Sequence, residues 1–253
     1  MASPYQNSCQ IFSAHEIDSL RKGGAILRDC LAHVAALVRP GITTIELDRA
    51  AESFIRKRGG KSAFKGYHNY PATLCTSIND VCVHGIPGKE VLKEGDIIAL
   101  DCGVLFGDLY TDACITVPVG KISRNAEMLL SATAEALVAG LSKVRAGART
   151  GDISSAIHET LLERGFDAMR QLTGHGLGDG LHQFPEIPNV GKAGSGSVIP
   201  LHTIIAIEPI STAGSTKIKE DDDGWTLRTG DGAFSAHFEH TVLVTEEGGE
   251  ILA

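Results

Sequence analysis

The sequence predicts a mixed α/β (α+β) fold. Three observations support this: capping boxes before amphipathic runs, short β-branched runs bounded by Gly, Pro and Asn, and an order of elements that occurs twice. The chain has 253 residues, of which 43% are hydrophobic, which is enough for a sizeable core. No run approaches the roughly 18 apolar residues of a membrane span, and no targeting segment is visible. We therefore expect a soluble, cytoplasmic protein.

Two helices are predicted first, each with a capping box at its start. The capping pairs are Ser13 with Glu16 and Thr43 with Glu46. Pro40 and Gly41 end the first helix, and Gly59 and Gly60 end the second. Further helices are expected at 125–144 and 152–164, and strands at 72–78, 96–104, 113–119, 204–210, 225–228 and 234–245.

An internal repeat underlies this order. The residues Val38, Arg39, Gly41, Thr44, Ala50, Arg58 and Gly59 recur as Val144, Arg145, Gly147, Thr150, Ala156, Arg164 and Gly165. The run at 97–101 also matches the run at 204–208, and each is expected to end its strand in a carboxylate, Asp101 or Glu208. Duplication is the simplest account, with chance similarity as the alternative.

Duplication predicts how the chain is organised. The expected parts are a short arm at 1–12 and a single domain at 13–253 with pseudo-repeats at 13–120 and 121–253. A pseudo-twofold axis between the halves would place Asp101 and Glu208 side by side in one cleft. Two buried like charges there would need a cation.

Charge and cysteine content disfavour other classes of protein. Lys and Arg number 23 against 31 Asp and Glu, giving a net charge of −8 without a basic patch, which disfavours nucleic-acid binding. The six cysteines form no C-x-x-C pair, and we expect reduced thiols that lie mostly in the core. The acidic run at 220–223 is either a solvated turn or a negative rim near a pocket.

Acidic residues beside apolar strands are the main chemical signal. Asp101 and Glu208 follow apolar runs, where carboxylates are rarely buried unless they are paired or bound to metal. A hairpin is expected to return Asp112 beside Asp101, with Asp108 exposed in its turn. Taken singly, each of these residues also has an ordinary interpretation as a strand-end or turn residue.

Two further segments complete a metal-binding set. His175 lies between Gly174 and Gly176, which let the backbone approach a site closely, and His182 follows seven residues later. Glu239 interrupts an apolar strand. Four carboxylates and one imidazole suit Mn, Fe, Co or Zn and carry enough negative charge for two divalent ions. A lone histidine is otherwise more often structural.

In their order and spacing, Asp101, Asp112, His175, Glu208 and Glu239 resemble the ligands of methionine aminopeptidases, over nearly the whole chain. The supporting motifs are Asn79-Asp80-Val81-Cys82-Val83-His84-Gly85-Ile86-Pro87, Gly174-His175-Gly176, Ile207-Glu208-Pro209, Asp223-Gly224-Trp225-Thr226 and Glu239-His240-Thr241. The resemblance implies the pita-bread fold, in which pseudo-symmetric halves form a curved antiparallel sheet covered by helices. It implies that Asp101 binds one ion, that His175 and Glu208 bind the other, and that Asp112 and Glu239 bridge them.

The resemblance also implies an activity. The expected enzyme is a metallo-exopeptidase that removes the initiator methionine from nascent polypeptides with a small second residue, using a hydroxide activated by two divalent ions (Co, Mn, Fe or Zn). Glu208 is the expected general base, His182 contacts the scissile carbonyl and His84 contacts the substrate near the cleaved bond. The expected walls of the methionine pocket are Phe64, Tyr67, Tyr70, Cys75, Leu181 and Trp225. The expected partners are peptides with N-terminal methionine, with the ribosome as a candidate, and no nucleic acid or membrane; we expect a monomer.

Two departures from the family pattern keep a second enzyme class open. Leu181 stands where many relatives have an aromatic residue, and Thr111 precedes Asp112 where methionine aminopeptidases commonly have glycine. The second departure is similar to Xaa-Pro aminopeptidases and prolidases, which share the fold and the ligands. The interval between His182 and Glu208 leaves no room for the insertion of type II enzymes and indicates type I. A non-catalytic binding protein of the same fold is disfavoured by the complete ligand set.

Overall fold

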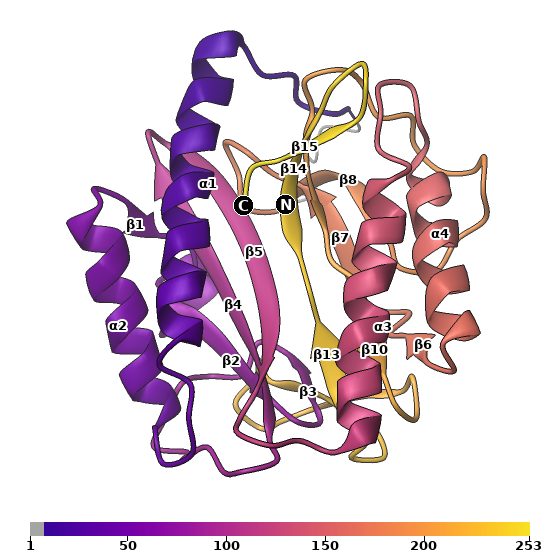
Figure 1. Ribbon diagram of the computed structural model, residues 1–253. Helices are drawn as coiled ribbons and strands as arrows, with labels where there is room; N and C mark the ends of the chain where they lie inside the picture. Colours follow the sequence, from indigo (N-terminus) through magenta and orange to yellow (C-terminus); the bar gives the residue numbers. More distant parts are fainter. Residues whose placement is uncertain (1–7) are drawn as a thin grey trace.

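Figure 1 shows the computed structural model, which describes residues 8–253. The helices are α1 (Ala14–Ala35), α2 (Thr44–Lys57), the short 3-10 helix η1 (Tyr67–Asn69), α3 (Arg124–Leu141) and α4 (Thr150–Glu163). The strands are β1 (Lys61–Ser62), β2 (Leu74–Ile78), β3 (Val81–Val83), β4 (Ile97–Phe106), β5 (Leu109–Pro118), β6 (Asp167–Ala168), β7 (Thr173–Gly176), β8 (Gln183–Pro188), β9 (Ile204–Ile207), β10 (Ile210–Thr212), β11 (Ile218–Glu220), β12 (Leu227–Thr229), β13 (Ser235–His237), β14 (His240–Val244) and β15 (Gly249–Ile251). Residues 1–7 of the predicted arm lie outside the described residues.

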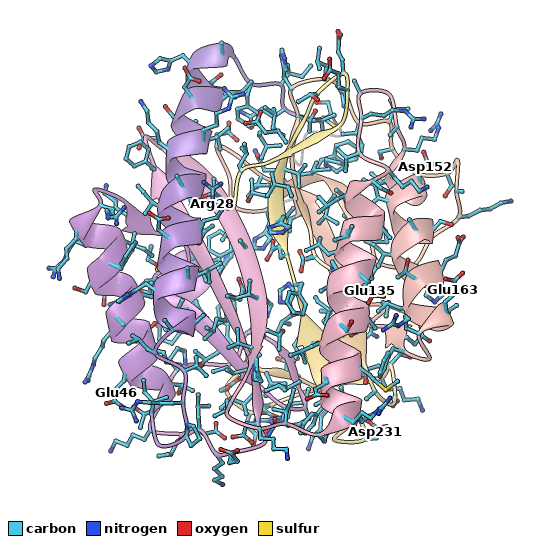
Figure 2. The ribbon with its side chains drawn as sticks, viewed as in Figure 1. Arg28, Glu46, Glu135, Asp152, Glu163 and Asp231 are labelled. Carbon is cyan, nitrogen blue, oxygen red and sulfur yellow. The ribbon has the colours of Figure 1, made fainter. Side chains whose placement is uncertain are left out.

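The predicted helix starts are confirmed. The Glu16 carboxylate accepts from the Ser13 backbone N–H at 2.8 Å. Glu46, at the start of α2 in Figure 2, accepts from the Thr43 backbone N–H at the same distance. Each contact occupies a backbone donor that the helix itself leaves free. Gly59 follows α2 with φ +84°, a left-handed conformation that costs glycine nothing.

Several predicted strand boundaries were wrong. β4 does not end at Asp101 but continues to Phe106, so this carboxylate lies in the middle of a strand. The predicted strand at 204–210 is two strands, β9 and β10, separated at Glu208-Pro209, because proline has no N–H for a sheet ladder. The predicted strand at 234–245 likewise breaks at Phe238-Glu239 into β13 and β14.

The β4–β5 hairpin is the longest antiparallel pair. Its register runs from Ile97 opposite Pro118 to Phe106 opposite Leu109. Gly107 and Asp108 form the turn, with φ of +57° and +65°, as is typical of a tight two-residue hairpin loop. Asp108 is exposed, as predicted.

Two antiparallel sheets meet along β5. In one, β4 pairs with β1, β2 and β5; the other has the order β15-β14-β9-β7-β8. Reciprocal backbone hydrogen bonds between Cys114 on β5 and Glu239 join the two sheets. Beside them, the Thr241 hydroxyl accepts from the Asp112 N–H at 2.8 Å and donates to the Asp112 carbonyl at 2.6 Å. We call these contacts the β5–β14 seam.

The helices cover one face of the strands. In Figure 1, α1 and α2 lie beside the strands of the first sheet, and α3 and α4 beside the second. Leu100 and Cys102 pack into the apolar cluster that contains residues of α1 and α2. Because side chains alternate along a strand, Asp101 between them points to the opposite face. The division into duplicated halves remains a proposal, supported by the fact that two helices lead into strands on each side.

The state of the cysteines agrees with expectation, since all six are free thiols and only Cys9 among them is not buried. Among residues 8–253, no helix combines the length and apolar character that crossing a membrane requires.

The β5–β14 seam generates a prediction about stability. Thr241 is fully buried, and Thr241→Val would leave the N–H and C=O of Asp112 without their partner. We expect the free energy of unfolding, measured in urea, to fall by about 2–3 kcal/mol. Thr241→Ser keeps the hydroxyl and should lose at most about 1 kcal/mol. Equal stability of the Val and Ser variants would contradict this role of the hydroxyl.

Candidate metal centre

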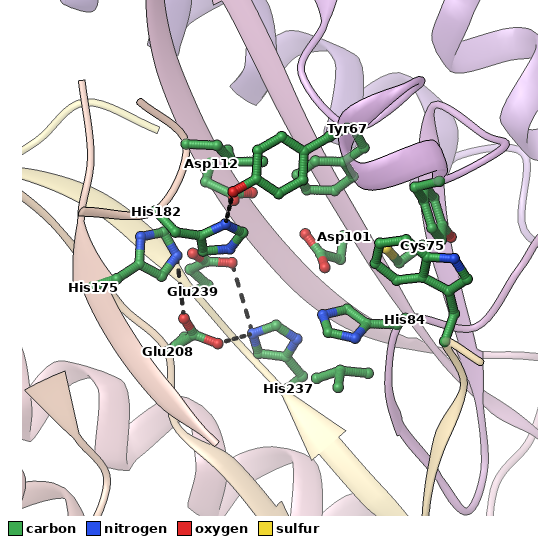
Figure 3. A pocket seen from close by; sticks show the side chains of 15 residues that line it. Tyr67, Cys75, His84, Asp101, Asp112, His175, His182, Glu208, His237 and Glu239 are labelled. Atoms are coloured by element: carbon green, nitrogen blue, oxygen red, sulfur yellow. Dashed lines mark hydrogen bonds and ion pairs between the residues drawn. The ribbon is translucent and has the colours of Figure 1, made fainter. Parts of the chain in front are cut away.

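One pocket collects the side chains that the sequence singled out, on the face of the strands away from the helices (Figure 3). Its lining includes every predicted site residue: Phe64, Tyr67, Tyr70, Cys75, His84, Asp101, Asp112, His175, Leu181, His182, Glu208, Trp225 and Glu239. Sequence reasoning missed two lining residues, Val83 and His237.

Neighbouring strands each bring one candidate ligand to the pocket. Asp101 lies on β4, Asp112 on β5, Glu239 before β14, Glu208 after β9 and His175 on β7. β4 pairs with β5, the β5–β14 seam follows, and β14 pairs with β9, which pairs with β7. The repeat prediction placed Asp101 and Glu208 together in one cleft. Both line this pocket, although β5 and β14 lie between the strands that carry them.

Register explains why the carboxylates share one face. Asp112 lies opposite Gly103, and Asp101 is two residues before Gly103, so the two carboxylates point the same way. Cys75 lies directly opposite Asp101 on β2, so its thiol lies on the same face of the sheet as the carboxyl.

Four carboxylates crowded into a buried site oppose one another's ionisation. Burial raises the pKa of Asp101 to about 7. Burial, followed by the charges of the neighbouring carboxylates, raises the pKa values of Asp112, Glu208 and Glu239 well above the usual range. A cation held between these groups would reverse the effect, since it favours the charged form of each carboxyl.

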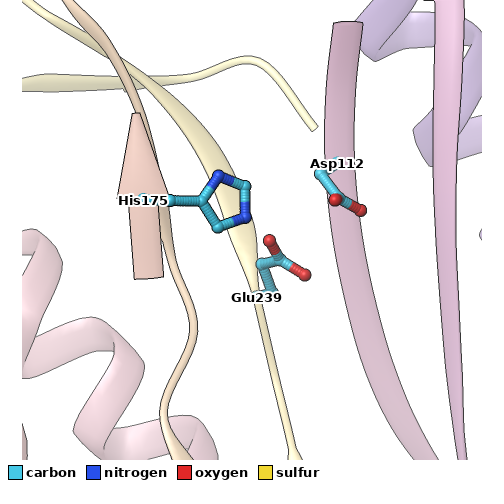
Figure 4. Close-up of side chains that lie close together, drawn as sticks. All are labelled: Asp112, His175 and Glu239. Atoms are coloured by element: carbon cyan, nitrogen blue, oxygen red, sulfur yellow. The ribbon is translucent and has the colours of Figure 1, made fainter. Parts of the chain in front are cut away.

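The donor set fits a divalent metal ion. Among the described residues, three deeply buried carboxylate oxygens have no hydrogen-bond partner: Oδ1 of Asp101, Oδ1 of Asp112 and Oε1 of Glu239. Ligand atoms of Asp112, His175 and Glu239 all lie within 4.8 Å of one another (Figure 4). Buried polar atoms normally have partners, so unsatisfied oxygens around a common space indicate a place for a cation.

His175 is oriented as a metal ligand. Its Nδ1 donates to the carbonyl of Gly176 at 3.0 Å, so the lone pair of the neutral ring lies on Nε2. Nε2 is 3.5 Å from Oε1 of Glu208, and burial lowers the pKa of His175 to about 4. The flanking glycines allow close packing: a Cβ on Gly174 would lie 2.3 Å from the Ala206 carbonyl oxygen.

Two more histidines lie around the ligands. His182 Nδ1 is 3.0 Å from the hydroxyl of Tyr67, and the His182 ring centre is 4.4 Å from that of His175. His84 has a left-handed backbone, with φ +61°, and its ring meets the Trp225 ring edge-on at 6.0 Å. Figure 3 shows both rings directed into the pocket.

An apolar cluster forms one wall of the pocket. It contains all six predicted methionine-pocket residues, with Phe64, Tyr70, Cys75 and Leu181 buried and Tyr67 and Trp225 partly buried against them. The rings of Tyr70 and Trp225 pack edge to face at 5.0 Å. The Tyr70 hydroxyl donates to the Leu74 carbonyl at 2.9 Å, which fixes the ring.

The acidic run before Trp225 is a turn, the first of the two interpretations that the sequence left open. The Asp223 carboxylate accepts from the backbone N–H groups of Trp225 and Thr226, each at 2.8 Å. Asp221 forms an ion pair with Arg228 at 2.7 Å. Asp221 and Asp223 therefore make contacts within the turn, and Asp223 holds Trp225 against the pocket.

Of the two residues that sequence reasoning missed, His237 left a usable signal. It lies two positions before Glu239, a spacing that puts both side chains on one face of an extended chain. The flanking Ala236 and Phe238 made the segment look like an ordinary core strand. Val83 gave no chemical signal, since a buried valine beside a site resembles any core valine.

Comparison with known proteins places these residues in context. The profile of metallopeptidase family M24 matches residues 18–246. The methionine aminopeptidase of Clostridium perfringens is 45% identical over 94% of this chain and 96% of its own. The crystal structure of methionine aminopeptidase from Thermotoga maritima superposes with a TM-score of 0.95 at 39% identity, covering 97% of this chain and 99% of that one. The X-Pro aminopeptidase of the same organism has a TM-score of 0.74 at 22% identity, covering 96% of this chain and 61% of that one, a likeness of fold alone.

Burial of the Asp101 carboxyl predicts a stability effect in the metal-free protein. Because burial raises the pKa of Asp101 to about 7, ionising it at pH 8 costs folding free energy that Asp101→Asn would remove. We expect the variant to gain roughly 1 kcal/mol or more in the free energy of unfolding at pH 8. At pH 5, below the raised pKa, the carboxyl is already protonated and the gain should shrink.

The measurement is denaturant unfolding of both proteins in chelator at the two pH values. If the variant is less stable than the unsubstituted protein at pH 8, or if its gain does not depend on pH, burial of an ionised Asp101 is not what destabilises the metal-free protein.

Proposed function

The chain belongs to metallopeptidase family M24, among its methionine aminopeptidases, and we propose that the pocket described above is where it removes N-terminal methionine. The observation that supports this most is the convergence of Asp101, Asp112, His175, Glu208 and Glu239 from neighbouring strands, with unsatisfied buried oxygens between them. Its substrates are peptides that begin with methionine. We propose nascent polypeptides with a small second residue as the physiological class.

We propose that these five residues hold two divalent ions. Asp112 and Glu239 occupy the central strands of the set and would bridge the pair. Asp101, on the β4 side, would complete the coordination of one ion. His175 and Glu208, on the β7 and β9 side, would complete the coordination of the other. Their geometry supports this assignment, since His175 Nε2 and Glu208 Oε1 lie 3.5 Å apart, close enough for two ligands of one ion.

Bound divalent ions would supply Lewis acidity that lowers the pKa of water and makes hydroxide available near neutral pH. In this proposal Glu208 is the general base, which takes a proton from that water and returns it to the leaving amine. Its place supports the role, because it directly follows β9 at the pocket edge and its side chain is 12% exposed, more than that of Glu239.

His182 and His84 would bind the scissile peptide. The Tyr67 hydroxyl can donate to Nδ1 of His182, which places the ring proton on Nε2, the nitrogen available to a carbonyl oxygen. A donor aimed at the developing oxyanion stabilises the transition state more than the ground state. His84, beside Trp225, would contact the substrate between the metal ligands and the apolar wall.

The apolar cluster would select methionine. A thioether gains from dispersion and from contact with aromatic rings, which Phe64, Tyr70 and Trp225 supply. The Cys75 thiol adds a soft, polarizable wall next to Asp101. Xaa-Pro peptidases are the second candidate because they share the fold, but the Xaa-Pro peptidases and prolidases among the structural neighbours show only 19–22% identity.

A substrate pair tests the proposed function. Metal-free protein should release no methionine from Met-Ala-Ser, and addition of Mn(II) or Co(II) should restore release. Ala-Pro-Ala should be cleaved far more slowly. Activity that survives exhaustive chelation would refute a metal mechanism. Faster cleavage of Ala-Pro-Ala than of Met-Ala-Ser would identify the protein as an Xaa-Pro peptidase instead.

Substitution of the proposed base gives a quantitative expectation. Glu208→Gln should lower kcat by about 10²–10⁴-fold, the usual contribution of general acid–base catalysis. Glu163→Gln, on the exposed surface of α4, is the matched control and should leave kcat unchanged. If the kcat of Glu208→Gln is within tenfold of the kcat of the control, Glu208 is not the general base.

The Tyr67–His182 hydrogen bond predicts a smaller effect. Tyr67→Phe should lower kcat by about fivefold, the equivalent of one net hydrogen bond of about 1 kcal/mol, with little change in KM. Tyr110→Phe, in the same apolar cluster but outside the pocket lining, serves as control. If Tyr67→Phe raises KM and leaves kcat unchanged, Tyr67 acts as a wall of the methionine pocket and not through His182.

A further inference from the structure

His237 is a buried imidazole that the catalytic proposal does not use. It is the last residue of β13, opposite Ile210 on β10. Its backbone is held at both ends by Thr116, whose hydroxyl accepts from the His237 N–H at 2.9 Å and donates to the His237 carbonyl at 2.7 Å. The side chain is 2% exposed and points into the pocket (Figure 3). Its position is therefore fixed by the sheet.

The ring faces two of the proposed metal ligands. Nε2 lies 3.7 Å from Oε2 of Glu208 and 3.7 Å from Oε2 of Glu239. These distances exceed a hydrogen bond, and closing them by less than about 1 Å would bring either oxygen to the usual N–H···O separation. Neither ring nitrogen has a hydrogen-bond partner among the described residues. Buried polar side chains normally have hydrogen-bond partners, so an unpartnered imidazole beside two carboxylates indicates a specific role.

The surroundings of the two ring nitrogens decide which one carries the proton. Nδ1 of His237 has no acceptor, and a buried N–H without an acceptor is costly. The proton therefore belongs on Nε2, where two carboxylate oxygens can accept it. His175 is the opposite case, because its Nδ1 donates to the Gly176 carbonyl and leaves the Nε2 lone pair for a metal. Of the two imidazoles, one is arranged as a ligand and the other as a donor.

We propose that His237 is a positioning residue whose Nε2–H is donated to the Oε2 atoms of Glu208 and Glu239, which turns their Oε1 atoms toward the metal ions. The oxygens are already divided in this way. Oε1 of Glu208 faces His175 Nε2 at 3.5 Å, and Oε1 of Glu239 is one of the unsatisfied buried oxygens. The inference rests on the proposed function, because carboxylate orientation matters here only when the carboxylates hold metal.

Loss of the His237 Nε2–H donor should lower the affinity of the protein for metal ions. Hydrogen bonds to ligating groups orient them, and loss of such a partner typically costs 10–100-fold in metal affinity or activity. A purely structural histidine would change the stability of the metal-free protein without a specific effect on the affinity for metal. The two cases are therefore separated by measuring affinity and metal-free stability together.

The test compares His237→Phe, His237→Gln and His237→Asn with the unsubstituted protein. Phe keeps a ring without a donor, Gln keeps a neutral donor of similar reach, and Asn has the same amide one methylene shorter. The Co(II) dissociation constant is measured by calorimetry on metal-free protein, together with the Co(II) absorption spectrum and metal-free unfolding. We expect affinity to fall about 10–100-fold in Phe and Asn and to stay within about threefold in Gln.

Native affinity in both Phe and Asn would overturn the proposal. A Gln variant as weak as Phe, with altered Co(II) absorption bands, would also overturn it and identify His237 as a direct ligand. If Phe does not fold, the Asn and Gln pair decides the question alone. If the unsubstituted protein does not bind Co(II), the proposed function is refuted and this inference with it. If it binds Co(II) and the variants bind with the same affinity, only the inference is refuted.

Discussion

Mutual repulsion among four buried carboxylates is the constraint on which the rest of this structure depends. Asp101, Asp112, Glu208 and Glu239 face one pocket, and burial raises the pKa of each, with neighbouring charge adding to the effect for Asp112, Glu208 and Glu239. Among residues 8–253, no Lys or Arg lines the pocket to neutralise them. A fold that holds such a set is stable in its charged form only with cations between the groups. The same buried carboxylates that are costly to ionise in the metal-free protein thus give the site its capacity to bind metal.

The sheet supplies the rigidity that this constraint demands. The candidate ligands are spread from residue 101 to residue 239, and they meet because neighbouring strands each contribute one. The β5–β14 seam is the critical join, since it fixes Asp112 on one side and Glu239 on the other through Cys114 and Thr241. The helices on the opposite face anchor the alternate residues of the same strands, so the carboxylates cannot turn away without disrupting the core.

Much of this arrangement could be predicted from the sequence, because the signals were local. Capping boxes fixed helix starts, and the residue types around His175 and Glu239 pointed to a metal site. Predictions failed where structure depends on pairing between distant segments. Asp101 was expected at a strand end, because apolar periodicity alone cannot show that the β4–β5 hairpin continues past it. His237 was missed because its importance arises from the carboxylates of Glu208 and Glu239, which only the folded sheet brings to it.

Five side chains on or directly beside five neighbouring strands are proposed to hold two metal ions at the site of peptide cleavage. Anomalous diffraction from crystals loaded with Mn(II), recorded on both sides of the metal absorption edge, tests this proposal most directly. The account predicts two anomalous peaks in the pocket, both bounded by Asp112 and Glu239, one also by Asp101 and the other also by His175 and Glu208. A single peak that leaves Asp101 without a metal contact, or peaks only outside this pocket, would contradict it.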